Sequence, residues 1–316
     1  MSTDLFTFGE SLSVFISSDT DSVMSANKFE RVTAGAEVNV AVALARLGLK
    51  AQYFSRFGND QLGSVMLADI EAEGVDVSLA KRVDSFTGAM VRNPGKTAPV
   101  EISYLRKGSA ASTIEPGDIL DSYISSTRWL HATGITCAIS ESGAKTVKHA
   151  LEKAAQLKVK SSFDLNIRRK LWSADAARKV LEPLVRDVEL LIGGEDEYQV
   201  VFGKVDPKQI LAEVNKRGCK IAVMTKGDQK MRFSIDGNYE EITPPKVVAV
   251  DPVGSGDAFT GGVIAGLLSG MSTKGALEQG SICGALVASM FGDWTGIPTG
   301  VAGVIDEVII QKVRGN

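Results

Sequence analysis

The sequence is poor in the residues that build disulfide frameworks and zinc sites. Its 316 residues include two histidines and three cysteines, Cys137, Cys219 and Cys283, with no CxxC pair and no Cys/His cluster. This spacing argues against a disulfide scaffold or a zinc site and fits a reducing compartment. The first residues, MSTDL, lack the basic and apolar blocks of a signal peptide, so we expect a cytoplasmic protein.

The sequence also lacks a basic block and a long apolar run. Its net charge is −3 at pH 7, and its Lys and Arg residues are scattered among Asp and Glu, which argues against a nucleic-acid partner. Residues 258–271 are apolar but too short and too rich in glycine to cross a membrane. With 44% hydrophobic residues the chain can bury a large core, and we expect a single domain over residues 1–316.

Strand-like and helix-like segments alternate along most of the chain. In segment 37–47 the apolar residues have helical spacing, and Gly48 follows at the position of a helix C-cap. Strands separated by helices of this length predict a parallel sheet and an α/β fold. We expect strands at 5–8, 51–57, 128–132, 160–164, 189–192 and 221–224, and helices at 37–47, 62–73, 143–157 and 174–186.

Two regions break this alternation. Residues 11–32 contain strand-like stretches and no helix, and so do residues 83–106. In the second region, segments 89–92 and 100–105 flank a turn signal, Asn-Pro-Gly, at 93–95. We expect these regions, about 11–34 and 83–107, to form a small β lid on the main body.

The most informative segment runs from residue 248 to 270. It predicts a short strand at 248–250, a glycine-rich turn at 251–257 (DPVGSGD) and a helix at 258–268. The first N–H groups of a helix lack internal partners and attract anions, and the small residues Gly254, Ser255 and Gly256 allow a phosphate to come close.

An acid, Asp257, stands at the start of this helix. A carboxylate beside a bound phosphate can accept the proton of an attacking hydroxyl, which typically raises the rate by ~10²–10⁴-fold. Asp is also common as a helix cap. The local pattern alone leaves both interpretations open.

The residues DPVGSGDAFTGG resemble the C-terminal signature of the PfkB (ribokinase-like) carbohydrate kinases. The resemblance implies that Asp257 is the catalytic base and that Gly254, Ser255 and Gly256 form the anion hole. It also implies a ribokinase-like α/β body, a central mostly parallel sheet flanked by helices, with a small β-sheet lid that closes over the sugar. In many relatives the lids pair, which implies a homo-oligomer, a dimer or higher.

The N-terminal half extends the resemblance. Residues 34–41 (AGAEVNVA) resemble the glycine-rich sugar-binding segment of the family, which implies substrate contacts from Gly35, Ala36 and Asn39. Ala36 replaces the usual second glycine. Residues 57–60 (FGND), followed by Gly63, resemble the G-x-D-x-x-G turn of the family.

The family also implies ATP and Mg²⁺ as cofactors. Glu197 matches the acid that helps to organise Mg²⁺, although acids after a strand can simply favour a helix start. Asp251 and the carbonyl of Val253 lie where some relatives bind K⁺. The residues implied at the nucleotide are Thr225, Lys226, Gly227, Gly254, Gly256 and Ser281. Lys230, which follows the turn at 225–227, replaces a glycine that the family resemblance leads us to expect. Ser281, in a separate segment, replaces a frequent Asn.

The sugar is predicted from a smaller set of residues. Residues 104–112 (YLRKGSAAS) and 164–168 (DLNIR) resemble segments of 2-keto-3-deoxygluconate kinases, and the latter is shared with fructokinases. Tyr104 and Arg106 lie on one face of a strand, where the guanidinium can grip a carboxylate. Arg168 is a second candidate anion partner. Met90 stands where these kinases often carry a Tyr.

Three functions stay open from these residues. The first is ATP-dependent phosphorylation of the primary hydroxyl of 2-keto-3-deoxygluconate, which gives the 6-phosphate. Two cationic side chains beside a neutral sugar are costly to bury without partners, which favours this acidic substrate. The second is a fructokinase or a kinase of another neutral sugar. The third is a sugar-binding regulator without turnover.

Overall fold

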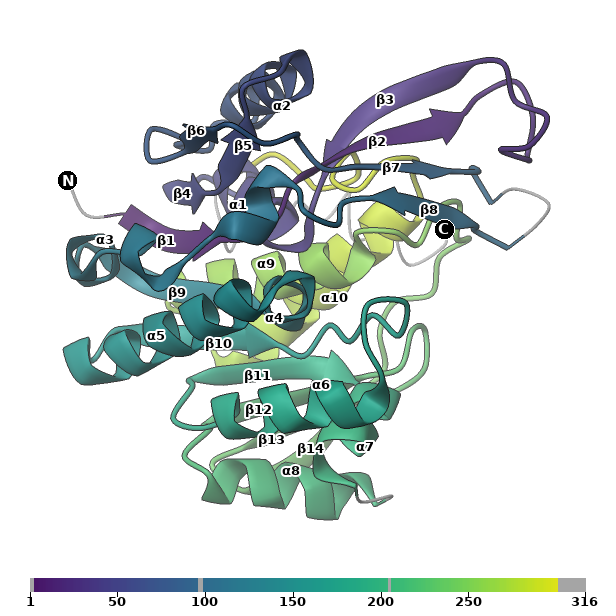
Figure 1. Cartoon of the computed structure of the whole chain (residues 1–316). Coiled ribbons are helices and arrows are strands. Elements are labelled where there is room, and N and C mark those ends of the chain that lie inside the picture. Colours follow the sequence, from purple (N-terminus) through teal and green to yellow (C-terminus); the bar gives the residue numbers. More distant parts are fainter. Residues whose placement is uncertain (1–2, 96–98, 204–205, 301–316) are drawn as a thin grey trace. The chain divides into compact units, whose positions relative to one another are not determined.

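The computed structural model describes residues 3–95, 99–203 and 206–300. The chain divides into two compact units (Figure 1). Unit 1 comprises Met1–Thr7 and Ile114–Pro245, and unit 2 comprises Phe8–Thr113 and Lys246–Asn316. The expectation of a single domain stays a prediction.

Unit 1 is built on a mostly parallel sheet with the strand order β14-β13-β12-β11-β10-β9-β1. Strands β1 and β9 to β12 run parallel, and β13 and β14 add an antiparallel hairpin at one edge. The bounds are β1 (Thr3–Phe8), β9 (Thr127–Thr133), β10 (Lys160–Asp164), β11 (Leu190–Gly194), β12 (Ile221–Thr225), β13 (Met231–Ile235) and β14 (Asn238–Ile242).

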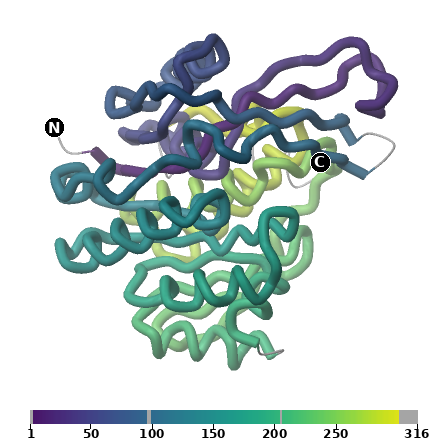
Figure 2. Tube along the Cα trace, in the orientation of Figure 1, coloured from purple at the N-terminus to yellow at the C-terminus, as the bar shows by residue number. Residues whose placement is uncertain are grey.

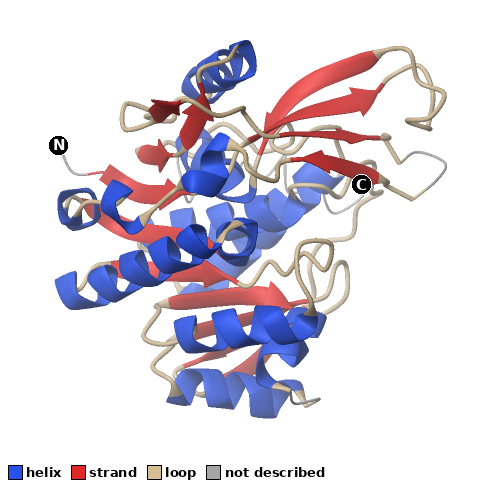
Figure 3. Cartoon of the chain, in the orientation of Figure 1, coloured by secondary structure: helices blue, strands red, loops and turns tan. Residues whose placement is uncertain are grey.

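Helices pack along this sheet, and Figure 3 shows the alternation of helix and strand that the sequence predicts. They are α3 (Asp121–Ser125), α4 (Gly134–Ile139), α5 (Glu141–Leu157), α6 (Ala174–Leu181), α7 (Glu195–Phe202) and α8 (Pro207–Lys216). Ser140 and Ser173 cap α5 and α6 with their hydroxyl groups. The helix predicted at 174–186 ends at Leu181 and continues as a short 3₁₀ turn that contains Pro183, because proline lacks the N–H that would extend the α-helix.

Unit 2 brings an early and a late part of the sequence together, residues 8–113 and 246–300, as the purple and yellow segments of Figure 2 show. Its helices are α1 (Ala36–Arg46), α2 (Gln61–Ala72), α9 (Ser255–Leu268) and α10 (Thr273–Ala288). Helix α9 packs closely because it is rich in glycine. A Cβ atom at Gly261 would lie 2.4 Å from the Cβ of Ala43 in α1, and one at Gly262 would lie 2.9 Å from the Cα of Gly280 in α10. These close approaches pack the middle of α9 against both α1 and α10.

Short strands complete unit 2. They are β4 (Ala51–Phe54) and the parallel pair β5 (Arg56–Gly58) and β6 (Lys81–Val83). The strand predicted at 51–57 is therefore interrupted at Ser55. The hydroxyl of Ser55 donates to the carbonyl oxygen of Gly9 at 2.6 Å, which ties this break to the end of β1.

Unit 2 also carries a small separate sheet in the order β3-β2-β7-β8. Its strands are β2 (Leu12–Ser17), β3 (Phe29–Ala34), β7 (Ala89–Arg92) and β8 (Ile102–Leu105). The outer pairs are antiparallel and β2 runs parallel to β7. The predicted α/β class, with a mostly parallel sheet, flanking helices and a small second sheet, is confirmed. Residues 96–98 of the predicted lid lie outside the described residues.

The strand predicted at 248–250 is wrong. The segment is irregular and exposed, with Val248 86% and Val250 39% accessible to solvent. The N–H groups of Val250 and Asp251 both donate to the carbonyl oxygen of Ala288, at the end of α10. The β-branched run therefore approaches a helix end instead of a neighbouring strand.

Candidate active site

Asp257 is the third residue of α9 and is 8% exposed. Asn39, in α1 and 1% exposed, donates from Nδ2 to Oδ2 of Asp257 at 2.7 Å. The same Nδ2 lies 3.4 Å from Oδ2 of Asp293. One buried amide thus joins two carboxylates at the start of the glycine-rich helix. Asp293 is a residue that the sequence did not single out.

The loop before α9 has the geometry of an anion site. Gly254 precedes the helix with φ +82°, and a Cβ atom there would lie 2.3 Å from the carbonyl oxygen of Asp293, so only glycine fits. Ser255 is held by its hydroxyl, which donates to the carbonyl oxygen of Pro252 at 2.8 Å. Gly256 is exposed, and a Cβ atom there would meet nothing within 4 Å. The N–H group of Ser255 donates to the carbonyl oxygen of Pro252 at 3.3 Å. Because the first N–H groups of a helix lack partners within it, the start of α9 is suited to an anion.

The predicted sugar-binding segment lies at the start of α1. Gly35 is the N-cap, and a Cβ atom there would lie 2.3 Å from the carbonyl oxygen of Glu10. Its N–H group donates to Oδ1 of Asn39 at 3.4 Å, and Ala36 follows, 6% exposed. Both ends of the Asn39 amide are thus used inside unit 2. The close approach at Gly35 explains why glycine stands there.

The predicted substrate residues of the small sheet lie together. Met90 in β7 is directly opposite Tyr104 in β8. Met90 is 6% exposed and belongs to an apolar cluster with Leu12, Val14 and Ala34, against which the half-buried Tyr104 packs. The guanidinium of Arg106 lies 4.9 Å from the centre of the Tyr104 ring. The prediction that Tyr104 and Arg106 share a face is confirmed.

Arg106 has a partner that sequence reasoning missed. Its Nη2 forms an ion pair with Oε2 of Glu10, and the two side chains are 9% and 1% exposed. Ser109 donates to Oε1 of Glu10 at 2.9 Å. Burial raises the pKa of Glu10, and the charge of Arg106 opposes this rise. The position of Glu10, an acid directly after an apolar strand and Gly9, was the signal that could have pointed to this partner. Because Glu10 is such a partner, the burial of Arg106 does not by itself favour an acidic substrate.

Asp251 also has a partner that the sequence did not single out. Its Oδ2 accepts from Nη2 of Arg92 at 2.5 Å, and both side chains are fully buried. Arg92 is two residues after Met90 in β7, and strand alternation was the signal that could have found it. Because a permanent cation already occupies the Asp251 carboxylate, the residues present do not fit the K⁺ site predicted at Asp251 and Val253.

In unit 1, Glu197 joins two chain segments. Its Oε2 accepts from the N–H of Gly194 at 2.7 Å and its Oε1 from the N–H of Ile167 at 2.5 Å. Burial raises the pKa of Glu197, while these hydrogen bonds and the charge of the exposed Arg168 oppose the rise. In the part of the chain that the structure describes, no group of three or more acidic, histidine or cysteine side chains could hold a metal ion by itself. A magnesium ion would therefore fit here only with ligands from water and phosphate.

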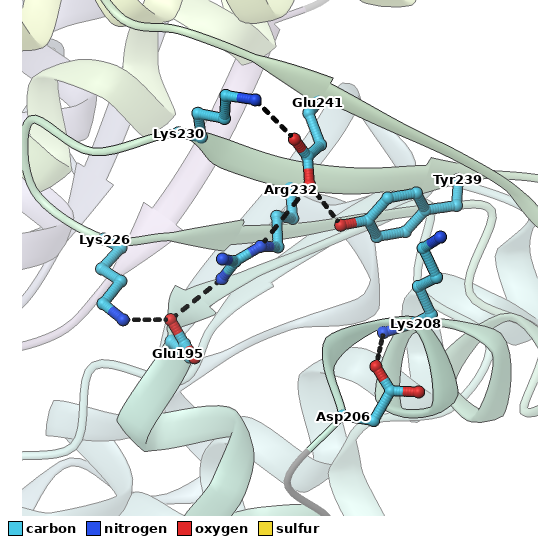
Figure 4. Close-up of polar contacts among 8 residues, drawn as sticks. All are labelled: Glu195, Asp206, Lys208, Lys226, Lys230, Arg232, Tyr239 and Glu241. Atoms are coloured by element: carbon cyan, nitrogen blue, oxygen red, sulfur yellow. Dashed lines mark hydrogen bonds and ion pairs between the residues drawn. The ribbon is translucent and has the colours of Figure 1, made fainter.

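The predicted nucleotide turn follows β12. Thr225 donates to the carbonyl oxygen of Gly193 at 3.3 Å, and Gly227 is exposed with φ +57°. Figure 4 shows Lys226 and Arg232 converging on the carboxylate of Glu195, at 2.9 and 3.0 Å. The hydrogen bond from Lys226 lowers the pKa of Glu195. Lys226 thus has an anionic partner within unit 1.

Lys230, the residue that replaces an expected glycine, contacts a second acid in the same region. Its Nζ lies 3.2 Å from Oε2 of Glu241, and the hydroxyl of Tyr239 donates to Oε1 of the same carboxylate at 2.8 Å (Figure 4). The turn is therefore bordered by ion pairs from β13 and β14.

Ser281, a predicted nucleotide residue, and His131 are part of the framework. Ser281 is 7% exposed in α10 and donates to the carbonyl oxygen of Leu277 at 2.9 Å, one helical turn back. His131 is fully buried in β9, and burial lowers its pKa to about 3. Its Nδ1 lies 2.8 Å from Oγ of Ser162.

Comparisons with known proteins agree with this fold. Residues 2–300 match the family described as pfkB family carbohydrate kinase. The chain is 33% identical over 305 residues to a 2-dehydro-3-deoxygluconokinase of Bacillus subtilis (strain 168), covering 95% of this chain and 94% of that protein. It is 29% identical over 296 residues to a 2-dehydro-3-deoxygalactonokinase of Haloferax volcanii, covering 93% of each. The crystal structure of 2-dehydro-3-deoxygluconokinase from Thermotoga maritima has a TM-score of 0.87 at 26% identity, covering 100% of this chain and 99% of that one.

The fold and these comparisons define a kinase, a transferase that phosphorylates an alcohol group of a sugar. The chain belongs to the PfkB family of carbohydrate kinases. In the described residues, no helix is both long and apolar enough to span a membrane. The predicted homo-oligomer stays a prediction.

Proposed function

We propose that the protein transfers the γ-phosphoryl group of ATP to the primary hydroxyl of 2-keto-3-deoxygluconate (2-dehydro-3-deoxygluconate), giving the 6-phosphate. The observation that carries the chemistry is the buried carboxylate of Asp257, which accepts a hydrogen bond from Asn39 and lies at the small-residue loop 254–256. The substrate is inferred from the similarity to the 2-dehydro-3-deoxygluconokinase of Bacillus subtilis and from Arg106 and Arg168.

In the proposed reaction, Asp257 accepts the proton of the attacking hydroxyl. The N–H groups at Gly254, Ser255 and Gly256 stabilise the charge on the transferring phosphoryl group. Gly254 is the residue that allows this turn, since its φ of +82° and the nearby carbonyl of Asp293 leave no room for a side chain. The chain thus supplies a base and a set of amide donors.

The cofactors are ATP and Mg²⁺. Mg²⁺, coordinated mainly by phosphate and water, would neutralise charge on the phosphates. Glu197 is the residue of unit 1 that would orient this hydrated ion, with Thr225, Lys226 and Gly227 at the nucleotide. Ser281 would contact the nucleotide from α10.

The sugar would lie between the start of α1 and the small sheet, both in unit 2. Gly35, Ala36 and Asn39 would contact its hydroxyls, and Met90 and Tyr104 would cover its carbon chain. The N–H groups of Arg106 that Glu10 does not engage would bind the carboxylate. The small sheet would act as the lid, and its closure would exclude water that hydrolyses ATP.

A second candidate, a fructokinase, is favoured by one observation. Glu10 neutralises Arg106, so this guanidinium does not require an anionic substrate. The two candidates differ in the charge of the acceptor and share Asp257.

One assay tests both candidates. ADP release is measured with ATP, Mg²⁺ and a panel that includes 2-keto-3-deoxygluconate, its galactonate epimer, fructose and ribose. We expect the highest kcat/KM with 2-keto-3-deoxygluconate. In Asp257→Asn, turnover should fall by ~10²-fold or more while sugar binding, measured by calorimetry, persists. Preferred use of fructose would support the second candidate, and near-normal turnover of Asp257→Asn would refute the role of the base.

A further inference from the structure

The ion pair between Arg92 and Asp251 lies directly ahead of the proposed anion site. Arg92 is the last residue of β7 in the small sheet, and Asp251 begins the loop that leads to α9. Nη2 of Arg92 and Oδ2 of Asp251 are 2.5 Å apart, and the exposure of each side chain is 0%. Nη1 of Arg92 also donates to the carbonyl oxygen of Asn93 at 3.3 Å. This is a fully buried, hydrogen-bonded charge pair.

Asp251 connects this pair to the loop. While Oδ2 binds the guanidinium, Oδ1 accepts from the N–H of Val253 at 3.2 Å, an Asx-type turn just before Gly254. The backbone N–H of Asp251 donates to Ala288 at the end of α10. The carboxylate of Asp251 thus holds the turn at Val253 through Oδ1 and is neutralised by Arg92 through Oδ2.

A monovalent cation would need the same carboxylate. Arg is charged at every accessible pH, and its guanidinium cannot give up a proton to make room. A second cation beside it would place two positive charges against one buried carboxylate, far from solvent, which is strongly unfavourable. The guanidinium of Arg92 therefore supplies the positive charge at Asp251 that a monovalent cation would otherwise supply.

We propose that Arg92 is a positioning residue that replaces a monovalent cation, so that the anion loop at 254–256 is set without K⁺ or Na⁺. The inference rests on the proposed kinase function, because one of its tests measures kcat. Its other test measures Tm and does not depend on that function. Arg92 acts through Asp251 and the turn at Val253, and it touches no reacting atom.

The first experiment compares KCl, NaCl and tetramethylammonium chloride at a constant ionic strength of about 0.1 M, with Mg²⁺ present. The wild-type protein should show the same kcat and the same Tm in all three salts. In Arg92→Ala the carboxylate is left without its cation, and kcat should fall roughly 10- to 100-fold in tetramethylammonium, as expected for a misplaced anion site. K⁺ or added guanidinium should restore kcat and raise Tm in this variant alone.

Two further variants keep the test decisive. Arg92→Lys retains the charge and should keep more of the wild-type kcat than Arg92→Ala. Arg92→Ala/Asp251→Asn removes both charges, so it should fold even where the single variant does not. Its kcat should be reduced, and neither K⁺ nor guanidinium should restore it.

The proposal is overturned if the kcat or Tm of the wild-type protein rises several-fold or by several degrees in K⁺ over tetramethylammonium. It is also overturned if the double variant keeps the wild-type kcat without K⁺. If no sugar is phosphorylated, the proposed function fails, and the Tm comparison between wild type and Arg92→Ala still decides the role of Arg92.

Discussion

The side-chain amide of Asn39 donates to the carboxylate of Asp257 across 218 positions of sequence, at 2.7 Å and in a buried setting. The sequence predicted that Asn39 contacts the sugar and that Asp257 is the base. The structure adds that the two residues are bonded to each other. In the proposed reaction Asn39 can therefore orient the carboxylate of Asp257, because its Nδ2 donates to the Oδ2 of Asp257.

This contact predicts the effect of Asn39→Ala. A hydrogen bond to a charged group is worth about 1.5–3 kcal/mol, and its loss lets the carboxylate turn away from the attacking oxygen. We expect kcat to fall by ~10-fold or more, with a smaller change in KM for ATP. Steady-state kinetics with Asn238→Ala, an exposed Asn in β14, as the control would measure this. An unchanged kcat would mean that Asn39 does not orient the base.

The Glu10–Arg106 pair predicts a change in substrate preference. Arg106→Ala would leave Glu10 buried and unpaired, at a cost of about 3–5 kcal/mol, so Glu10→Gln is the sharper variant. Gln keeps an acceptor for Ser109 but releases the charge of Arg106. We expect kcat/KM for 2-keto-3-deoxygluconate to rise relative to fructose by roughly tenfold, the equivalent of about 1.4 kcal/mol.

The matched control for this experiment is Glu101→Gln, an exposed acid that precedes β8 on the same small sheet. It removes the same charge without touching Arg106. An equal change in both variants would indicate a general charge effect, and no change in either would argue against a substrate carboxylate at Arg106.

Glu197 is predicted to serve both the fold and the metal. In Glu197→Gln only one of the N–H groups of Gly194 and Ile167 keeps an oxygen acceptor, at a cost of about 1–3 kcal/mol, so Tm should fall. Because the charge is also lost, the Mg²⁺ concentration at half-maximal activity should rise by roughly tenfold, or about 1.4 kcal/mol. Asp196→Asn, an exposed neighbour, is the control for net charge. A lower Tm with unchanged Mg²⁺ dependence would leave Glu197 a structural residue only.

His131 predicts a pH dependence of stability. Its pKa falls from the ordinary 6.5 to about 3 in the folded protein because it is buried. Between these values the unfolded chain binds a proton that the folded chain does not, so this residue removes stability as the pH falls from 6.5 towards 3. His131→Asn should flatten the slope of the unfolding free energy against pH by up to about 1.4 kcal/mol per pH unit.

Calorimetric Tm values across this pH range would measure the flattening, with His149→Asn, half-buried on α5, as the control. The same slope in wild type and His131→Asn would show that other groups dominate acid unfolding. A change in kcat at neutral pH would contradict the structural interpretation of His131.

The sequence by itself predicted the features that depend on residues close together in the chain. The strand at 160–164 and the helix start at Ser140 follow from side-chain periodicity and capping, which act over a few residues. The position of Asp257 at the start of a glycine-rich helix could be predicted for the same reason. The interruption at Ser55 and the failed strand at 248–250 were not, because they depend on partners at Gly9 and Ala288.

Only the tertiary structure decided which charges meet. Glu10 with Arg106, and Arg92 with Asp251, are separated by 96 and 159 positions, yet each pair is buried. A charged side chain loses its solvation on burial and needs an opposite charge nearby, wherever in the chain that charge originates. Sequence spacing therefore allowed Asp257 and the loop at 254–256 to be proposed as base and anion site, while chain folding decided that Arg92 pairs with Asp251 and that Glu10 pairs with Arg106.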